Sequence, residues 1–225
     1  MSDVPRVLLV GASGLIGQEV ISLYTGREDL HLIALVRREM KLPKGLRIEV
    51  LVADPAEWTQ AVHTIAPDKV LCALGTTIAQ QGGDQEAFAA VDRDLVLQVA
   101  RAAKDAGATS FTVVSSVGAD PRSKNFYLRT KGEMEDALRK LRFPRLDVLR
   151  PGLLKGDRRE GGRPLEKLGR IASPVTDLFL QGERRKYRSI AARDVAQAML
   201  RTTREKARGQ FAHTRDGIML LVGRN

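Results

Sequence analysis

The chain has little cysteine, few aromatic residues and no long apolar run, and each of these absences excludes some classes of protein. The single cysteine, Cys72, excludes an internal disulfide, and it lies in the apolar run 70–74, where a buried, inert thiol is expected. No cysteine or histidine spacing typical of a metal site occurs. Aromatic residues make up 4% of the chain and do not interleave with its basic runs. Stacking platforms for single-stranded nucleic acid are therefore not expected, and nucleic acid is the least favoured partner.

Long apolar runs are missing as well. No stretch of about eighteen apolar residues occurs, so the sequence predicts no membrane span. The first residues lead straight into an apolar strand, without the basic-then-apolar pattern of a leader. We therefore expect a cytoplasmic protein. The chain has 225 residues and 43% apolar content, which is enough for one large core, so residues 1–225 are expected to form a single domain.

Positive charge is concentrated in the last third of the chain. Residues 1–150 hold 20 Lys and Arg against 19 Asp and Glu, a net charge of +1, whereas residues 151–225 hold 17 against 8, a net charge of +9. Such a surface would favour an anionic substrate or an acidic protein partner. The alternative is a basic face that meets only water.

Short apolar runs alternate with longer helical patterns through the first two thirds. The expected strands are 6–10, 31–36, 47–52, 69–73, 110–115 and 146–150, and the expected helices are 15–24, 86–106, 127–141 and 193–203. Strands that are apolar on both faces are typical of a parallel sheet covered by helices on both sides. The sequence therefore predicts an α/β fold of the Rossmann type, a doubly wound parallel sheet with a small C-terminal substrate or partner region. Residues 152–190 would form an embedded loop region on the substrate side.

A glycine motif follows the first expected strand directly. Gly11, Gly14 and Gly17 give a GxxGxxG spacing. The first glycine permits a tight turn, the second lets the backbone approach a pyrophosphate, and the third lets the helix pack closely on the sheet. The helix that begins here directs free N–H groups and its positive dipole end at the phosphates. The expected backbone donors are Ser13, Gly14, Leu15 and Ile16.

Two arginines at the end of the second expected strand predict the type of coenzyme. An acidic residue there would bind the ribose 2′-hydroxyl of NAD, whereas Arg37 and Arg38 are suited to the 2′-phosphate of NADPH or NADP+. The alternative is a pair of ordinary surface arginines. Asp54, after the third strand, either contacts the adenine or forms an Asp-Pro turn. The fourth strand ends in Leu74, Gly75 and Thr76, which would pass close to the coenzyme.

Tyr127 and Lys131 lie four residues apart on one face of an expected helix. A phenol can give or take a proton at a carbonyl oxygen while hydride moves, and a neighbouring ammonium favours the phenolate. Lys131 could also hold the nicotinamide ribose. Ser116 would stabilise charge that develops on the substrate oxygen, although Ser115 is an equal alternative. The helix of Tyr127 begins between the fifth and sixth expected strands, after Ser115 and Ser116 at the carboxyl end of the fifth. Open α/β sheets bind their ligands at that edge.

Taken together, the motifs resemble those of the short-chain dehydrogenase/reductase superfamily, and more closely its atypical Tat-interacting-protein branch of NADPH-binding proteins. The resembling segments, within residues 7–200, are 74–77, 91–94, 115–120, 125–127, 131–133 and 150–152. The resemblance implies that Tyr127 is the general acid/base, Lys131 its partner and Ser116 the third member. It also places Pro151, Gly152, Leu153 and Leu154 beside the nicotinamide.

The resemblance has one departure, which bears on function. Where many members of the superfamily carry an asparagine that completes a proton relay, this chain has Asp92. We expect an NADPH-dependent oxidoreductase that acts on a small carbonyl or alcohol. The alternative is an NADPH-binding redox sensor or adaptor with little turnover, which would contact a protein partner through the basic last third.

Overall fold

The computed structural model describes residues 4–25, 27–46, 48–156 and 187–223. Parallel strands form a 7-stranded sheet in the spatial order β3-β2-β1-β4-β5-β6-β9. The strands are β1 (Arg6–Val10), β2 (His31–Val36), β3 (Glu49–Val52), β4 (Lys69–Cys72), β5 (Ser110–Val114), β6 (Arg145–Leu149) and β9 (Gly209–His213). The prediction of a Rossmann-type parallel sheet is confirmed.

The chain order of the strands locates the ligand-binding edge. The chain moves outward from β1 to β2 and β3, then returns to β4 on the other side of β1. The connections of β1 and β4 therefore leave the sheet in opposite directions at their carboxyl ends. Open α/β sheets bind ligands in the crevice at such a point. The glycine motif after β1 and the segment after β4 both lie there.

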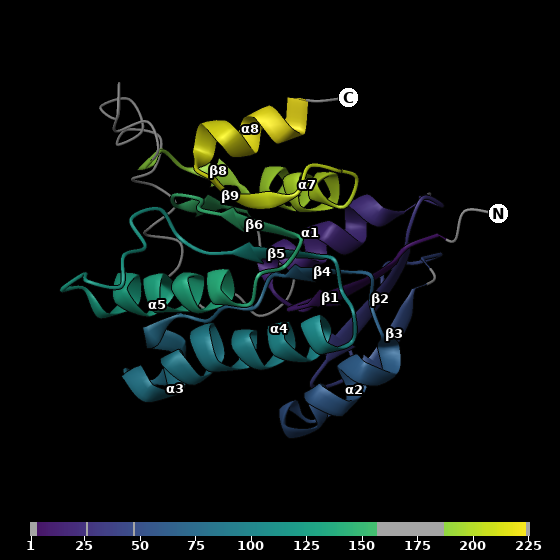
Figure 1. Ribbon diagram of the computed structural model, residues 1–225, viewed down its shortest axis with the longest axis horizontal. Coiled ribbons are helices and arrows are strands. Elements are labelled where there is room, and N and C mark those ends of the chain that lie inside the picture. The colour runs from purple at the N-terminus through teal and green to yellow at the C-terminus, as the bar shows by residue number, and fades with distance from the viewer. Residues whose placement is uncertain (1–3, 26, 47, 157–186, 224–225) are drawn as a thin grey trace.

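Helices cover both faces of the sheet (Figure 1). On one face lie α2 (Trp58–Ile65), α3 (Gln85–Ala89), α4 (Val96–Asp105) and α5 (Phe126–Lys140). On the other lie α1 (Leu15–Tyr24), α7 (Ala192–Thr202) and α8 (Arg215–Gly223). A separate apolar cluster fills each interface. Because neither side of the central strands meets water, these strands are apolar on both faces, as their sequences indicated.

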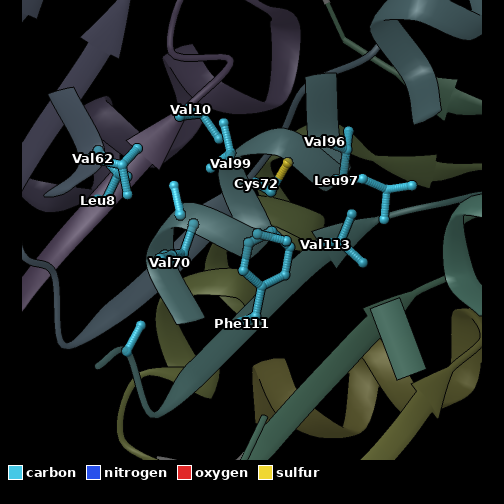
Figure 2. Close-up of a cluster of buried hydrophobic side chains, with 14 of the residues drawn as sticks. Leu8, Val10, Val62, Val70, Cys72, Val96, Leu97, Val99, Phe111 and Val113 are labelled. Carbon is cyan, nitrogen blue, oxygen red and sulfur yellow. The ribbon is translucent and has the colours of Figure 1, made fainter. Parts of the chain in front are cut away.

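Figure 2 shows the cluster beneath α2 and α4. Side chains of the sheet pack there against side chains of the two helices. The sheet contributes Leu8, Val10, Val70, Cys72, Phe111 and Val113, and the helices contribute Val62, Val96, Leu97 and Val99. Phe111 and Cys72 have no exposed surface. The sulfur of Cys72 is thus part of the packed core, which confirms that this thiol is buried.

The long helix expected over 86–106 is not regular. It begins as α3, passes through a π-helical segment, η3 (Ala90–Leu95), and continues as α4. A π-helical turn inserts one extra residue, which turns the following side chains relative to those before it. The segment buries Asp92, whose exposed fraction is only 1%. Sequence periodicity alone did not indicate this change of winding.

The strands expected from the sequence agree with the structure to within two residues, but several elements were not expected. These are α2, β9, α8 and the short segments η1 (Pro55–Glu57), η2 (Ile78–Gln81), β7 (Leu154–Lys155) and β8 (Ile190–Ala191). β7 and β8 pair in parallel as a separate two-stranded ribbon. Residues 157–186, most of the expected loop region, lie outside the described residues. None of the described helices has the length and apolarity to cross a membrane.

Candidate functional site

The glycine motif forms a tight loop from the end of β1 into α1, and this loop packs against the end of β4. Gly11 has φ +83°, and a Cβ there would lie 2.4 Å from the carbonyl carbon of Ala73. A Cβ on Gly17 would lie 2.2 Å from the carbonyl oxygen of Gly11. Real side chains cannot occupy either space. Both glycines are therefore required by close backbone approach, as the motif predicted.

The N-terminus of α1 is open. Gly14 is its N-cap in an extended conformation, and no side-chain hydrogen bond from the described part of the chain caps the first turn. The N–H of Gly14 donates to the carbonyl oxygen of Gly11 at 3.0 Å, so this expected phosphate donor is already engaged within the loop. The N–H groups of Leu15 and Ile16 have no such partner among the described residues and lie at the positive end of the helix dipole. Ser13 is exposed beside them.

Arg37 and Arg38 follow the carboxyl end of β2 and are both exposed. Among the described residues, neither forms an ion pair or a side-chain hydrogen bond, so both guanidinium groups are available to an anion. The carboxylate of Asp54, after β3, forms a local hydrogen bond. Its Oδ1 accepts a hydrogen bond from the N–H of Ala56 at 2.9 Å and caps η1, which favours the Asp-Pro turn over an adenine contact.

Tyr127 lies in the first turn of α5, which starts where the side chain of Asn125 accepts a hydrogen bond from the N–H of Leu128 at 3.1 Å. The tyrosine ring is half-buried and packs at 5.5 Å, between ring centroids, on the buried ring of Phe88. Lys131 lies one turn further along α5, with only 5% of its side chain exposed. The two expected catalytic residues thus share one face of α5.

The ammonium of Lys131 has a buried counter-ion. Its Nζ lies 2.7 Å from Oδ1 of Asp92, and the other carboxylate oxygen, Oδ2, accepts a hydrogen bond from the N–H of Thr76 at 2.8 Å. Among the described residues, Lys131 is the only ion-pair partner of this carboxylate. Asp92 therefore connects α5 to the segment that follows β4.

The two candidate serines differ in their surroundings. The hydroxyl of Ser115 is buried and donates to Oε1 of Glu135 at 2.6 Å. The hydroxyl of Ser116 is half-buried, and its one hydrogen bond to a described residue is a long one of 3.3 Å, donated to the carbonyl oxygen of Val117. Ser115 is thus held by the protein interior, whereas Ser116 is available to a ligand.

Glu135 holds this part of the site together, and it has no exposed surface. Besides the hydroxyl of Ser115, its carboxylate accepts hydrogen bonds from Arg139 at 2.9 Å and from Nε of Arg150 at 2.9 Å. The hydrogen bond to Glu135 raises the pKa of the Arg150 guanidinium above its ordinary value, against the opposing effect of burial. Ser115 follows β5, and Arg150 follows β6 and precedes Pro151. Glu135 therefore connects α5 to the loops after both strands.

The loops after β5 and β6 are in direct contact. The N–H of Val117 donates to the carbonyl oxygen of Pro151 at 2.9 Å. A Cβ on Gly152 would lie 2.5 Å from the carbonyl oxygen of Arg188, so the returning chain passes directly over it. Pro151 is buried and Leu154 is half-buried against the core, while Leu153 is exposed. The chain on both sides of residues 157–186 is therefore anchored beside the serine loop.

Four of the eight basic side chains that the structure describes in the last third form ion pairs with other described residues. Long-range ion pairs join Arg193 to Glu19 at 3.4 Å and Arg204 to Asp29 at 3.0 Å. Local pairs join Arg201 to Glu205 and Arg215 to Asp216, at 3.8 Å and 3.3 Å. These four arginines therefore do not form a field of unpaired charge for nucleic acid or an acidic protein. The remaining basic run, within 157–186, lies outside the described residues.

Residues 11–206 match the sequence profile of a family described as NAD(P)H-binding. The chain belongs to this NAD(P)H-binding family. Rat protein HTATIP2 is 32% identical over 226 residues, which cover 97% of this chain and 89% of the rat protein. The mitochondrial protein FMP52 of Saccharomyces cerevisiae is 35% identical over 154 residues, and FMP52 of Meyerozyma guilliermondii is 36% identical over 155. The aligned segment spans 66% of each of these two fungal relatives and 67% and 68% of this chain.

Solved structures of related fold bind NAD. MoeE5 in complex with UDP-glucose and NAD matches with a TM-score of 0.69 at 18% identity, covering 92% of this chain and 75% of MoeE5. The Bordetella bronchiseptica enzyme WbmG in complex with NAD matches with a TM-score of 0.68 at 16% identity, covering 95% and 73%. At these identities the likeness shows the fold alone. Together with the family match, it confirms the resemblance to the atypical short-chain dehydrogenase/reductases.

The expectation of a cytoplasmic protein is wrong. Relatives from three fungi, Meyerozyma guilliermondii, Emericella nidulans and Saccharomyces cerevisiae, are named as mitochondrial proteins, which points away from a plain cytoplasmic location. The expectation rested on missing leader-like and membrane-spanning patterns. Such absences do not distinguish one aqueous compartment from another, because the same packed α/β fold is stable in each of them.

Three residues of the site in this NAD(P)H-binding chain were not expected from the sequence: Phe88, Glu135 and the side chain of Arg150. Glu135 carried a usable signal, since it continues the four-residue spacing of Tyr127 and Lys131 on α5. Phe88 carried none, because its contact with Tyr127 depends on how α3 and α5 pack.

Proposed function

We propose that the chain is an NADPH-dependent oxidoreductase of the short-chain dehydrogenase type, which acts on a carbonyl or alcohol. One observation carries the proposal. A half-buried phenol and a buried ammonium lie one helical turn apart at the sheet edge where the glycine loop opens. NADPH, when bound, would supply or, as NADP+, accept the hydride. The chain has to supply the proton and a polar environment for the substrate oxygen.

Tyr127 is the proposed general acid/base. Its ring is fixed by Phe88, so the hydroxyl is presented in one direction. In a reduction it gives its proton to the carbonyl oxygen as hydride arrives at the carbon, and in the reverse direction it takes the proton back. Lys131 stabilises the phenolate that is left and holds the hydroxyl groups of the nicotinamide ribose.

Ser116 is the proposed third member, in preference to Ser115. A hydroxyl that stabilises a developing oxyanion has to have its proton free for the substrate. Ser115 already donates its proton to Glu135, a charged acceptor, whereas the hydroxyl of Ser116 is engaged only weakly. Ser115 then serves to fix the backbone from which Ser116 projects.

The preference for NADPH over NADH rests on Arg37 and Arg38. Both are exposed at the end of β2 without an acidic partner among the described residues, and guanidinium groups bind phosphate through several hydrogen bonds at once. Leu15 and Ile16 would direct their N–H groups at the pyrophosphate. Gly75 and Thr76 would border the nicotinamide half.

The substrate side is proposed to be the embedded region 152–190, within a single domain of residues 1–225. The pairing of Leu154 with Ile190 in β7 and β8 closes the base of this region beside the serine loop. Pro151 and Leu154 then border the nicotinamide. The basic residues of the region suit an anionic carbonyl or alcohol substrate.

Binding of the two coenzymes tests the choice of cofactor. Protein freed of carried-over ligand is titrated with NADPH and NADH by fluorescence or calorimetry, and NADPH is expected to bind more tightly. In the variant with Arg37→Ala and Arg38→Ala the NADPH to NADH affinity ratio should fall at least about tenfold, since a hydrogen bond to a charged group contributes about 1.5 to 3 kcal/mol. Arg101→Ala, which removes an exposed arginine from α4, should leave the ratio unchanged.

Turnover then separates the enzyme from a redox sensor. Loss of NADPH absorbance is followed with a panel of carbonyl compounds, anionic ones included. Tyr127→Phe keeps the ring on Phe88 and should lower kcat by about 100-fold or more, with NADPH affinity little changed. Tight binding without oxidation of the coenzyme by any carbonyl, unaltered by Tyr127→Phe, would instead support the sensor. A wild-type protein that binds neither coenzyme would refute both.

A further inference from the structure

A carboxylate lies beneath the proposed coenzyme site, and the mechanism above does not use it. Asp92 is 1% exposed and has one oxygen on Nζ of Lys131 and the other on the N–H of Thr76. We propose that Asp92 is a positioning residue, which fixes the ammonium of Lys131 and the backbone of Thr76 in the arrangement that receives the nicotinamide half of the coenzyme. This inference rests on the proposed function, since it assumes that NADPH binds at this edge.

The packing of two helical segments explains why this residue is in place. Phe88 and Asp92 lie four residues apart, and they contact Tyr127 and Lys131, which also lie four residues apart on α5. The ring holds the phenol and the carboxylate holds the ammonium. The π-helical winding of η3 supports the second contact, because the extra residue per turn changes the direction of the side chains after Phe88.

Charge is the first reason why an aspartate matters here. The ammonium of Lys131 is almost fully buried, and a buried charge without a partner is strongly unfavourable. Two further titratable groups of the described chain do not neutralise the charge of Lys131. Cys72 is held neutral because burial raises the pKa of its thiol to about 12, and Glu135 is already bound to Arg139 and Arg150.

The geometry leaves Lys131 able to bind a ligand. An ammonium has three N–H groups, and among the described residues its only ion-pair partner is Asp92, so the remaining N–H groups can point to a ligand. Gly75 leaves the approach to the pair open. A Cβ on Gly75 would lie 3.5 Å from Oδ1 of Asp92 and 4.0 Å from Nζ of Lys131. A ribose hydroxyl could therefore reach the ammonium across the glycine.

Two binding probes separate this role from a general structural one. NADPH carries the nicotinamide ribose, whereas adenosine 2′,5′-bisphosphate carries only the adenosine end that Arg37 and Arg38 would hold. Asp92→Asn keeps an oxygen for the N–H of Thr76 and removes the charge. We expect its Kd for NADPH to rise about tenfold, a change of about 1.4 kcal/mol, and its Kd for the bisphosphate to stay constant.

Asp94→Asn is the matched control. Asp94 lies in the same segment η3, but its carboxylate is exposed and pairs with Arg93 on the surface, so neither Kd should change. In a Lys131→Met background the effect of Asp92→Asn on NADPH binding should disappear, because the ammonium that it positions is gone. Thermal unfolding of each variant checks that the fold is kept.

Gly75→Ala provides a second test that leaves Asp92 in place. The added methyl would meet the ion pair at ordinary contact distances, so the fold should tolerate it, but the ligand approach would be covered. NADPH binding should weaken and bisphosphate binding should not. An unchanged Kd for NADPH in both Asp92→Asn and Gly75→Ala, or an equal loss of both probes, would overturn the inference. Wild-type protein that binds neither probe would refute the proposed function itself.

Discussion

The reactivity of the chain's single thiol is determined by its surroundings. Cys72 ends β4 and has no exposed surface. Burial raises the pKa of this thiol to about 12, although hydrogen bonding by the backbone at Leu74 and the charge of Lys131 act in the opposite direction. Because the thiolate is the reactive form of cysteine, the proximity of Lys131 does not make Cys72 a nucleophile. The sequence correctly predicted a buried thiol, since it lies within an apolar run.

The reactivity of Cys72 gives a residue-scale prediction. A chromogenic disulfide reagent at pH 8 should detect no thiol in the native protein over minutes and one thiol per chain in denaturant, because the reagent needs both access and thiolate. Cys72→Ala should give no signal under either condition, which controls for reagent breakdown. Rapid labelling of the native wild-type protein would show that the β4 end opens readily and that the burial described here is wrong.

At the scale of elements, α5 carries the site as a row of side chains with four-residue spacing. Tyr127, Lys131, Glu135 and Arg139 follow one another along one face. The first two would contact ligand, and Glu135 anchors the serine loop and the segment before Pro151. The same helix therefore both presents the proposed catalytic groups and fixes the loops opposite them.

Glu135→Gln tests that anchoring role. The amide removes a buried negative charge from two arginines, so the free energy of unfolding should fall by about 2 to 3 kcal/mol in a urea titration. Asp136→Asn is the control. Asp136 is the next residue and pairs with Arg139 at 2.6 Å on the surface, where such a pair contributes less than about 1 kcal/mol. Equal losses in the two variants would mean that Glu135 is no more than another surface partner.

The sequence predicted the elements that have strong periodicity and missed those that depend on packing. The central strands were readable because both of their faces are apolar. Helix α2 is amphipathic but has only 8 residues, which is too short for a clear helical period, and β9 is an edge strand whose residues are at most half-buried. The π-helical winding of η3 left no trace in composition.

For the site, local motifs were informative and long-range contacts were not. The glycine spacing predicted the loop, and the structure shows why Gly11 and Gly17 are needed there. The pairing of Lys131 with Asp92 joins residues 39 positions apart and could be found only once η3 was packed on α5. The departure at Asp92 was visible in the sequence, but its consequence was not.

At the scale of the whole molecule, two arginines of the last third form ion pairs with acidic residues of the first third. Arg193 pairs with Glu19 on α1, and Arg204 pairs with Asp29 in the turn before β2. A count along the sequence showed an excess of positive charge after residue 151, but it could not show that acidic partners come from the other end of the chain. These pairs connect α7 and its following loop to the β1–β2 unit.

The Asp29 cluster predicts a dependence of stability on pH. Hydrogen bonds from Arg27, and then from Arg204, hold the pKa of the Asp29 carboxyl well below its ordinary value, although partial burial opposes them. A carboxyl whose pKa is lowered by folding stabilises the protein above its unfolded pKa of about 4 and loses that contribution as pH falls further. The carboxyl is partly exposed, so solvent screening limits the contribution to about 0.5 to 1 kcal/mol at pH 7.

Asp29→Asn should therefore be less stable than wild type by that amount at neutral pH, and the difference should shrink steadily as pH falls below about 4. Urea titrations from pH 7 to pH 3 measure it. Glu39→Gln, which neutralises an exposed carboxylate without an ion pair to a described residue, should show no such trend. A difference between wild type and Asp29→Asn that stays constant down to pH 3 would mean that the variant acts through packing. In that case the charge link between the two ends of the chain contributes nothing measurable to stability.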